Sequence, residues 1–381
     1  MLTFVVALLA ASMMTLPAQA WGKGGKGGGG NGGGNGGGGE EPTTTLSFVW
    51  TSIGSGFGDV MNNHGDVAWD ESSTIFVSID DGNGGRKLVD LKTVFLSQGL
   101  YSVPDGTDFS IRWPEDINDD GQIILWIQER LNNQTVYQAQ YLYTPERIVA
   151  GITEAARLDL LPDQCDSVNN AGVAAGSPPG PDLLVWDSLN GTVTVATASD
   201  GYGIWAAPAI NLFGEIAVEG FIAGTSRRVA MKYSTSNGLE RLFRKDPSTS
   251  SVIDINENGT IVGHWSRNLG SPRQAFRSQI DGKPENIAFG GDFSEPVSIN
   301  NLEDIVGYVT FSGQPVQLPY LYTDSYGSLD ILDNSINAPN VPTWQLNLRS
   351  INDQRQILIV HIDSAAGTTE MFLVDVVEQT P

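Results

Sequence analysis

A short segment that recurs seven times, at the spacing of a propeller blade, predicts that this 381-residue chain folds as an all-β, seven-bladed β-propeller. Two further observations support this fold class. Short apolar runs typical of strands follow the copies of the segment, and helical periodicity of useful length is absent after the N-terminal segment. Six or eight blades, or two stacked β-sandwiches, are the alternatives.

The repeated segment has the form apolar–Asn–x–x–Gly–x–apolar. Its asparagines are separated by 56, 51, 42, 45, 44 and 52 residues, and they are Asn62, Asn118, Asn169, Asn211, Asn256, Asn300 and Asn352. Asn bonds its own backbone two residues on and tolerates left-handed dihedrals, while Gly adopts positive φ without steric cost. We therefore expect each copy to be a hairpin between two strands.

The sixth and seventh copies depart from this pattern because Glu303 and Arg355 stand where the others have Gly. Holding a residue with a side chain in the left-handed conformation costs roughly 1–2 kcal/mol. These two turns should therefore adopt another conformation or be strained.

The strands expected after each turn are short and strongly apolar. Ile123–Ile127 is a nearly continuous apolar run, which favours a strand covered on both faces by neighbouring blades. The expected strands after the second copy are 123–129, 138–143 and 147–152, and those after the fifth copy are 261–266, 273–277 and 286–289. The longest interval, 66–117, is where we expect an elaborated surface.

The last blade lacks one strand at its C-terminal end. Strands at 357–362 and 370–377 leave only Glu378 to Pro381, and Leu46–Trp50 is a strand without a partner. We predict that Leu46–Trp50 completes the seventh blade and closes the ring, which removes exposed sheet edges.

The N-terminal part predicts export. Residues 1–20 combine an apolar run with small residues at a cleavage site near Ala20, which is typical of a secretory signal peptide, although no Lys or Arg precedes the run. Residues 21–44 form a Gly-rich leader that we expect to be disordered, and 45–381 form the propeller domain. The expected location is secreted, periplasmic or extracellular.

Composition restricts the partners. The chain has 44 acidic and 21 basic residues, a net charge of −23, which disfavours nucleic acid and anionic membrane surfaces. No membrane span is expected in the mature chain, and we expect a monomer. Cys165 is the only cysteine, so no intrachain disulfide can form, and we expect it to be a small buried hydrophobe.

The repeat resembles a known family. Ile255–Gly263 reads Ile-Asn-Glu-Asn-Gly-Thr-Ile-Val-Gly, and Arg273–Phe276 reads Arg-Gln-Ala-Phe. Both elements are similar to the bacterial extracellular HAF-type repeat, and the resemblance covers about residues 46 to 377. It implies a secreted β-propeller and carries over no catalytic residues.

One segment could bind calcium. Asp116, Asn118 and Asp120 place oxygen ligands at alternate positions before Gly121, the opening pattern of a calcium loop. The twelfth position holds Ile127 instead of a bidentate acid, and the same residues belong to the repeated turn. The sequence favours the turn over a calcium site and predicts no other cofactor.

Three tryptophans are the candidate ligand-binding residues. Trp113, Trp205 and Trp344 each precede a copy of the repeat, where the chain crosses between blades. If they line one rim of the disc, they can stack on sugar rings or peptide side chains; the alternative is packing between blades. Trp69, Trp126 and Trp265 follow the turn, and we expect them in the core.

The sequence favours a non-enzymatic binding or surface-interaction module whose ligand is an extracellular protein or a glycan. No G-x-S-x-G or H-E-x-x-H motif is present, and no catalytic residues are assigned. The alternatives are a carbohydrate-active or lactone-cleaving propeller enzyme, which clustered acids at one channel mouth would favour, and a calcium-stiffened structural protein.

Overall fold

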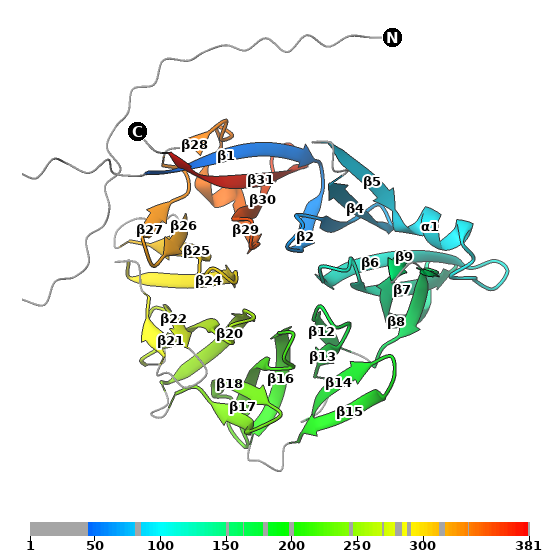
Figure 1. Ribbon diagram of the computed structural model, residues 1–381, viewed down its shortest axis with the longest axis horizontal. Helices are drawn as coiled ribbons and strands as arrows, with labels where there is room; N and C mark the ends of the chain where they lie inside the picture. Colours follow the sequence, from blue (N-terminus) through cyan, green and yellow to red (C-terminus); the bar gives the residue numbers. More distant parts are fainter. Residues whose placement is uncertain are drawn as a thin grey trace, which may run out of the picture.

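Seven sheets surround a central axis in the computed structural model (Figure 1). The structure describes residues 45–80, 85–149, 152–162, 164–177, 182–197, 202–243, 247–268, 270–278, 284–287, 291–311, 317–333 and 335–379. In this part of the chain each of these seven sheets contains one copy of the repeat and forms one blade, numbered here in chain order. The predicted all-β, seven-bladed propeller is therefore confirmed.

Blades 1 to 3 are formed by the first part of the chain. Blade 1 contains β2 (Phe57–Met61), β3 (Val67–Glu71), β4 (Thr74–Asp80) and β5 (Arg86–Asp90). Blade 2 contains β6 (Asp108–Ile117), β7 (Ile123–Leu131), β8 (Gln134–Thr144) and β11 (Arg157–Leu160). Blade 3 contains β12 (Cys165–Val168), β13 (Ala174–Gly176), β14 (Leu183–Asp187) and β15 (Gly191–Ala196).

Blades 4 to 6 repeat the same order of strands. Blade 4 contains β16 (Tyr202–Ile210), β17 (Ile216–Ile222), β18 (Arg228–Ser234) and β19 (Gly238–Arg241). Blade 5 contains β20 (Thr249–Ile255), β21 (Ile261–Ser266), β22 (Gln274–Ser278) and β23 (Glu285–Asn286). Blade 6 contains β24 (Phe293–Ile299), β25 (Ile305–Thr310), β26 (Leu318–Thr323) and β27 (Gly327–Asp330).

Blade 7 joins the two ends of the propeller. It contains β29 (Leu346–Ile351), β30 (Gln356–Asp363), β31 (Thr368–Gln379) and the N-terminal β1 (Thr45–Gly54). β1 pairs antiparallel with β31, as Figure 1 shows, and the short β28 (Ser335–Ile336) pairs with its other edge. Phe48 and Trp50 of β1 are 1% and 3% exposed in the core of this blade. The predicted closure by Leu46–Trp50 is confirmed.

The strands are covered on both faces, as the apolar runs predicted. In β7, Ile123 and Leu125 pack in a cluster with blade 1 residues, whereas Ile124 packs in a different cluster with Cys165 and Trp186 of blade 3. Both faces of the strand are therefore in the core. Cys165 is 2% exposed, as expected for a small buried hydrophobe.

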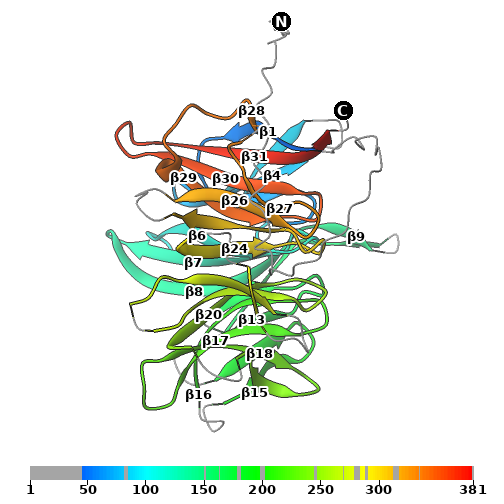
Figure 2. The same cartoon turned by 90° about the vertical axis from the view of Figure 1, so that its left-hand side faces the viewer.

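One local prediction was wrong. The apolar run 147–152 is not the fourth strand of blade 2: β9 (Arg147–Val149) and β10 (Ile152–Glu154) form a separate hairpin, visible at one side of the disc in Figure 2. Ile148 and Ile152 are largely exposed there, and β11 takes the place against β8 because its Leu158 reaches the core.

The interval 66–117 contains a helix, α1 (Leu91–Ser97), that the sequence did not predict. Asp90 caps this helix by accepting hydrogen bonds from the N–H groups of Lys92 and Thr93. The helix has seven residues, of which only Leu91 and Phe95 are buried. Two apolar positions are too few for helical periodicity to be recognised in the sequence. Residues 81–84 of this interval lie outside the described residues.

The seven motif asparagines form a closed circuit of hydrogen bonds around the axis. In each turn, Oδ1 accepts backbone N–H bonds of 2.8–3.1 Å from its own turn. In each turn, Nδ2 donates to the backbone carbonyl of the motif Asn in the next blade, at 2.8–3.4 Å. The last of these bonds joins Asn352 to Asn62 and closes the circuit.

A second circuit runs beside the first and is interrupted once. The backbone N–H that follows each motif Asn donates to the side chain at the same position of the next blade, as from Asn63 to Asp119 at 2.9 Å. Five more bonds of this kind, at 2.7–3.0 Å, join the other blades. Blade 4 has Leu212 at this position, which offers no side-chain acceptor to Asn170.

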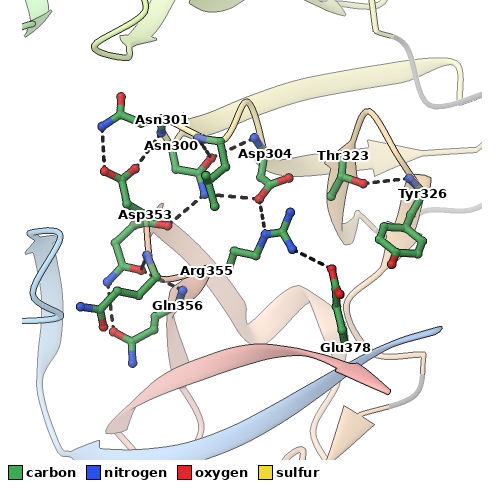
Figure 3. Close-up of polar contacts among 12 residues, drawn as sticks. Asn300, Asn301, Asp304, Thr323, Tyr326, Asp353, Arg355, Gln356 and Glu378 are labelled. Atoms are coloured by element: carbon green, nitrogen blue, oxygen red, sulfur yellow. Dashed lines mark hydrogen bonds and ion pairs between the residues drawn. The ribbon is translucent and has the colours of Figure 1, made fainter. Parts of the chain in front are cut away.

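The two turns without Gly keep the left-handed conformation of the other five turns, and they are strained because a residue with a side chain occupies it. Glu303 has φ +66° and Arg355 has φ +60°, and both donate the usual backbone bond to the motif Asn. Their side chains make contacts that Gly cannot make. Arg355 forms ion pairs with the buried Asp304 of blade 6 at 2.7 Å and with Glu378 at 3.2 Å (Figure 3).

Candidate functional site: a tryptophan cleft on the crossover face

The strand order gives the disc two unlike faces. The innermost strand of every blade begins where the chain crosses from the previous blade and ends at the motif Asn. All seven Asn turns therefore lie on one face, which we name the Asn-turn face. The crossings and the loops between the second and third strands lie on the opposite face, the crossover face.

A cleft of about 460 Å³ opens on the crossover face where blades 7, 1 and 2 meet. We name it the Trp113 cleft. Its walls include hydroxyl, carboxylate, guanidinium and indole groups from all three blades, contributed by Ser55, Asp59, Asp70, Arg112, Trp113 and Thr369.

Trp113 owes its position to a break in the sheet. The pairing of β6 with β7 shifts between Arg112 and Asp116, and within this irregularity Trp113 has φ +47°. A bulky residue with positive φ is a true outlier, and such strain costs on the order of 1–3 kcal/mol. The indole is 44% exposed and rests edge-on against Trp126, with ring centroids 6.5 Å apart. The backbone thus holds an exposed indole at the wall of the cleft.

An ion pair between blades 1 and 2 fixes the polar groups beside Trp113. The Nε atom of Arg112 lies 2.7 Å from Oδ2 of Asp70, which also accepts a 3.3 Å hydrogen bond from the backbone N–H of Trp113. The guanidinium of Arg112 lies 5.8 Å from the ring centroid of Trp113. Asp70 therefore orients both the arginine and the backbone that carries the indole.

Carboxylates line the innermost strands of three successive blades. Asp59, Glu115 and Asp166 all stand three residues before a motif Asn, and Arg349 occupies this position in blade 7. Pro208, Ile253 and Val297 stand there in blades 4 to 6. At this level of the fold, one side of the ring carries charged residues and the other carries apolar ones.

These carboxyl groups are harder to ionise than usual. Burial raises the pKa of Asp59 to about 6, the charges of Asp70 and Glu115 add to this, and Arg349 opposes it. Burial likewise raises the pKa of Asp166 to about 6, with a contribution from Glu115. Glu115 also has a raised pKa because of burial, although it accepts a 2.9 Å hydrogen bond from Trp126 Nε1. The acids therefore affect one another.

The structure places the three predicted tryptophans in different blades. Trp113 lines the cleft described above, and Trp205 of blade 4 is 62% exposed, with the Arg228 guanidinium 5.6 Å from its ring centroid. Trp344 belongs to a short 3₁₀ helix, Thr343–Gln345, that precedes blade 7, and its side chain is outside the described residues. Of the tryptophans expected in the core, Trp69 is buried, and Trp126 and Trp265 are half-buried.

The residues of the candidate calcium segment serve contacts within the protein. Asp116 Oδ2 accepts a 2.8 Å hydrogen bond from the backbone N–H of Val168, and Asn118 takes part in the asparagine circuit. Asp120 pairs with Arg147 at 2.6 Å. Among the described residues no group of three or more His, Cys, Asp or Glu side chains is arranged to hold a metal ion.

Sequence reasoning missed the polar part of the cleft. Asp70 and Arg112 are 42 positions apart and belong to different blades, and Asp59 has no motif of its own. The one available signal was the repeat itself, since Asp59, Glu115 and Asp166 share the same offset from the motif Asn.

Comparisons with known proteins show similarity in fold alone. No protein-family model matches the sequence, and no curated protein matches it. Prolyl oligopeptidase B from Galerina marginata is similar in structure, with a TM-score of 0.51 and 9% identity over 88% of this chain and 51% of that protein. The chain thus spans about half of that protein.

Two further solved structures resemble the chain less closely. TolB from Acinetobacter baumannii has a TM-score of 0.38 at 13% identity, covering 86% of this chain and 81% of TolB. The β-propeller domain of the Trilobed protease from Pyrococcus furiosus has a TM-score of 0.39 at 10% identity, covering 76% and 99%. Within the described residues no helix has the length and apolar character needed to cross a membrane. The chain is a seven-bladed β-propeller, and these similarities assign it to no family.

Proposed function

We propose that this chain is a secreted, glycan-binding propeller of the HAF-repeat type, and that the Trp113 cleft is its binding site. The observation that carries the proposal is the exposed indole held at φ +47° beside a fixed Arg112–Asp70 pair. Backbone strain at an exposed aromatic residue is typical of a functional position, because packing alone would not favour it.

The cleft has the chemistry that recognises a sugar. An exposed indole face takes the apolar C–H face of a pyranose ring, while carboxylate, guanidinium and hydroxyl groups around it bond the ring hydroxyls. Asp70 and Arg112 are oriented before the ligand arrives, which reduces the entropy lost on binding. The N-terminal signal and the Gly-rich leader support an extracellular role.

Replacing Trp113 tests this function. We expect Trp113→Gly to abolish binding of the neutral oligosaccharide that the wild type selects from a panel of gluco-, xylo- and chito-oligosaccharides, measured by calorimetry. Because Gly relieves the left-handed strain, the free energy of unfolding should stay within about 1 kcal/mol of the wild type. Tyr137→Ala, which removes another exposed aromatic side chain of blade 2, is the control. Unchanged sugar binding by the Trp113 variant would refute the proposal.

A second candidate function is glycoside hydrolysis in the same cleft. It is favoured by Asp59, whose raised pKa of about 6 leaves a fraction protonated near neutral pH, in the field of Asp70 and Glu115. One protonated and one ionised carboxyl group are what such catalysis requires. The test is to incubate the selected oligosaccharide with the wild type and with Asp59→Asn. If the wild type hydrolyses the oligosaccharide and the variant binds it without hydrolysis, the protein is an enzyme.

A further inference from the structure

We infer a second ligand site, which takes the carboxylate or sulfate group of an acidic glycan, in the crossover-face cleft between blades 4 and 5. This inference goes beyond the proposed function, because it assigns a second site that takes a different class of glycan. The cleft has a volume of about 630 Å³, and its walls include Thr225, Arg227, Arg228, Ser248, Thr249 and Arg267. We name it the arginine cleft.

The local charge is opposite to that of the whole protein. Residues 225–280 carry nine of the 21 Lys and Arg residues and only four of the 44 Asp and Glu residues. Among the described residues that line the arginine cleft, none carries a carboxylate. Because charges more than about 8 Å apart are largely screened at physiological salt, an anion in this cleft is affected mainly by the nearest charges, which are the guanidinium groups of Arg227, Arg228 and Arg267 and the Glu219 carboxylate paired with Arg228. The net charge of −23 therefore does not prevent an anion from binding here.

The three arginines are held in different ways. Nε and one terminal nitrogen of Arg227 donate to the carbonyl oxygen of Pro247, at 3.1 and 2.6 Å, which anchors this side chain at the wall. Arg228 pairs with Glu219 at 2.8 Å, and its side chain stays 53% exposed. Arg267 is exposed and has no hydrogen-bond or ion-pair partner among the described residues. Arg267 is therefore the group most available to a ligand.

Trp205 supplies a surface for a sugar ring. Its indole is 62% exposed and is stacked near the guanidinium of Arg228. Arg228 lines the arginine cleft and also lies 5.6 Å from the Trp205 ring centroid, so the indole and the arginines together match a pyranose that carries an anionic substituent: the ring stacks on the indole and the anion pairs with the guanidinium groups. A carboxylate on a uronic acid and a sulfate ester share this chemistry.

The test measures binding of four polymers to the full mature chain: polygalacturonate, dextran sulfate, neutral dextran and polyglutamate. We expect one or both of the acidic glycans to bind, with affinity that falls as salt rises, and the other two to bind at least about tenfold more weakly. The first two polymers distinguish carboxylate from sulfate. Polyglutamate that binds as tightly as the acidic glycans, with no loss in Trp205→Ala, would overturn the glycan class in favour of an acidic peptide.

Matched variants locate the site. Arg267→Gln and Trp205→Ala should each weaken binding of the acidic glycan about tenfold, while Lys87→Gln, which removes one exposed positive charge from blade 1, should change it less than about twofold. Equal losses in Arg267→Gln and Lys87→Gln, or none in either, would refute the arginine cleft. Trp113→Gly separates the two proposals: its effect on neutral sugars tests the Trp113 cleft, whatever the Arg267 variant does.

Discussion

Replacing a motif Asn by Asp separates two roles of that side chain. Asp caps the same turn as well as Asn does, because its oxygen accepts the same backbone N–H bonds. An Asp cannot donate, however, and Asn118 uses its amide nitrogen as a donor twice: to the carbonyl of Asn169 at 2.8 Å and to Oε1 of Gln122 at 2.7 Å. If the side chain served only the turn, Asn118→Asp would be nearly neutral.

The expected cost follows from the contacts that are lost. Each hydrogen bond contributes about 0.5–1.5 kcal/mol, and a buried acceptor left without a donor costs about 1–3 kcal/mol. Asn118 is 4% exposed, so the new carboxylate would also be buried opposite a carbonyl oxygen. We expect Asn118→Asp to lower the free energy of unfolding by about 2–5 kcal/mol at pH 7.

Urea unfolding followed by tryptophan fluorescence measures this change. Asn133→Asp is the matched control, because Asn133 lies in an exposed hairpin turn with φ +62° and takes no part in the circuit. The control should change the free energy of unfolding by less than about 0.5 kcal/mol. If Asn118→Asp also changes it by less than this amount, the asparagine circuit does not stabilise the propeller and our reasoning is wrong.

Three further predictions concern charge, strain and closure. Burial raises the pKa of Asp116 to about 7 in the folded state, against about 4 for an exposed carboxyl group. The contribution of Asp116 to stability is therefore complete below pH 4 and disappears as the pH rises through 7. In Asp116→Asn, the free energy of unfolding measured with urea should depend less on pH over this range. Arg355→Ala should lower the free energy of unfolding by about 3–5 kcal/mol because it leaves Asp304 buried without its ion-pair partner. Arg355→Gly should lower it by about 1 kcal/mol less, because Gly relieves the strain of the positive φ. Equal free energies of unfolding for the two variants in chemical denaturation would show that the turn is not strained. Trp50 of the closing strand β1 is 3% exposed and donates a hydrogen bond to Ser335. Trp50→Ala should therefore lower the free energy of unfolding by about 3–5 kcal/mol and lower the Tm. An unchanged Tm would show that β1 is not needed for closure.

The repeat predicted the fold because its physics is local. Gly259 in the motif turn and the apolar residues on either side of it specify a hairpin without reference to distant residues, and seven copies then specify seven blades. The closure by Leu46–Trp50 could also be predicted, since counting strands left one place in blade 7 and one strand without a partner. The inter-blade use of Asn62 and its equivalents could not, because the acceptor of each amide is about one blade away in the sequence.

The candidate site was foreseen only in its aromatic residues. Trp113 was identified by its place in the crossing between blades, but its left-handed backbone and its contact with Trp126 depend on a sheet irregularity that leaves no mark in composition. The raised pKa of Asp59 reflects burial and the charges of Asp70 and Glu115. Arg267 had no motif, and its importance follows from the neighbours that the fold brings to it.

The asparagine circuit has a fixed rotational sense, because every amide points to the following blade and every carbonyl receives from the preceding one. Each blade thus presents the same donor on one side and the same acceptor on the other, like a subunit in a head-to-tail ring of identical protomers. As far as this circuit is concerned, a whole blade could be duplicated or deleted without leaving an unmatched donor or acceptor. This sequence is therefore suited to diversification by exchange of entire blades, while the two clefts on the crossover face vary independently.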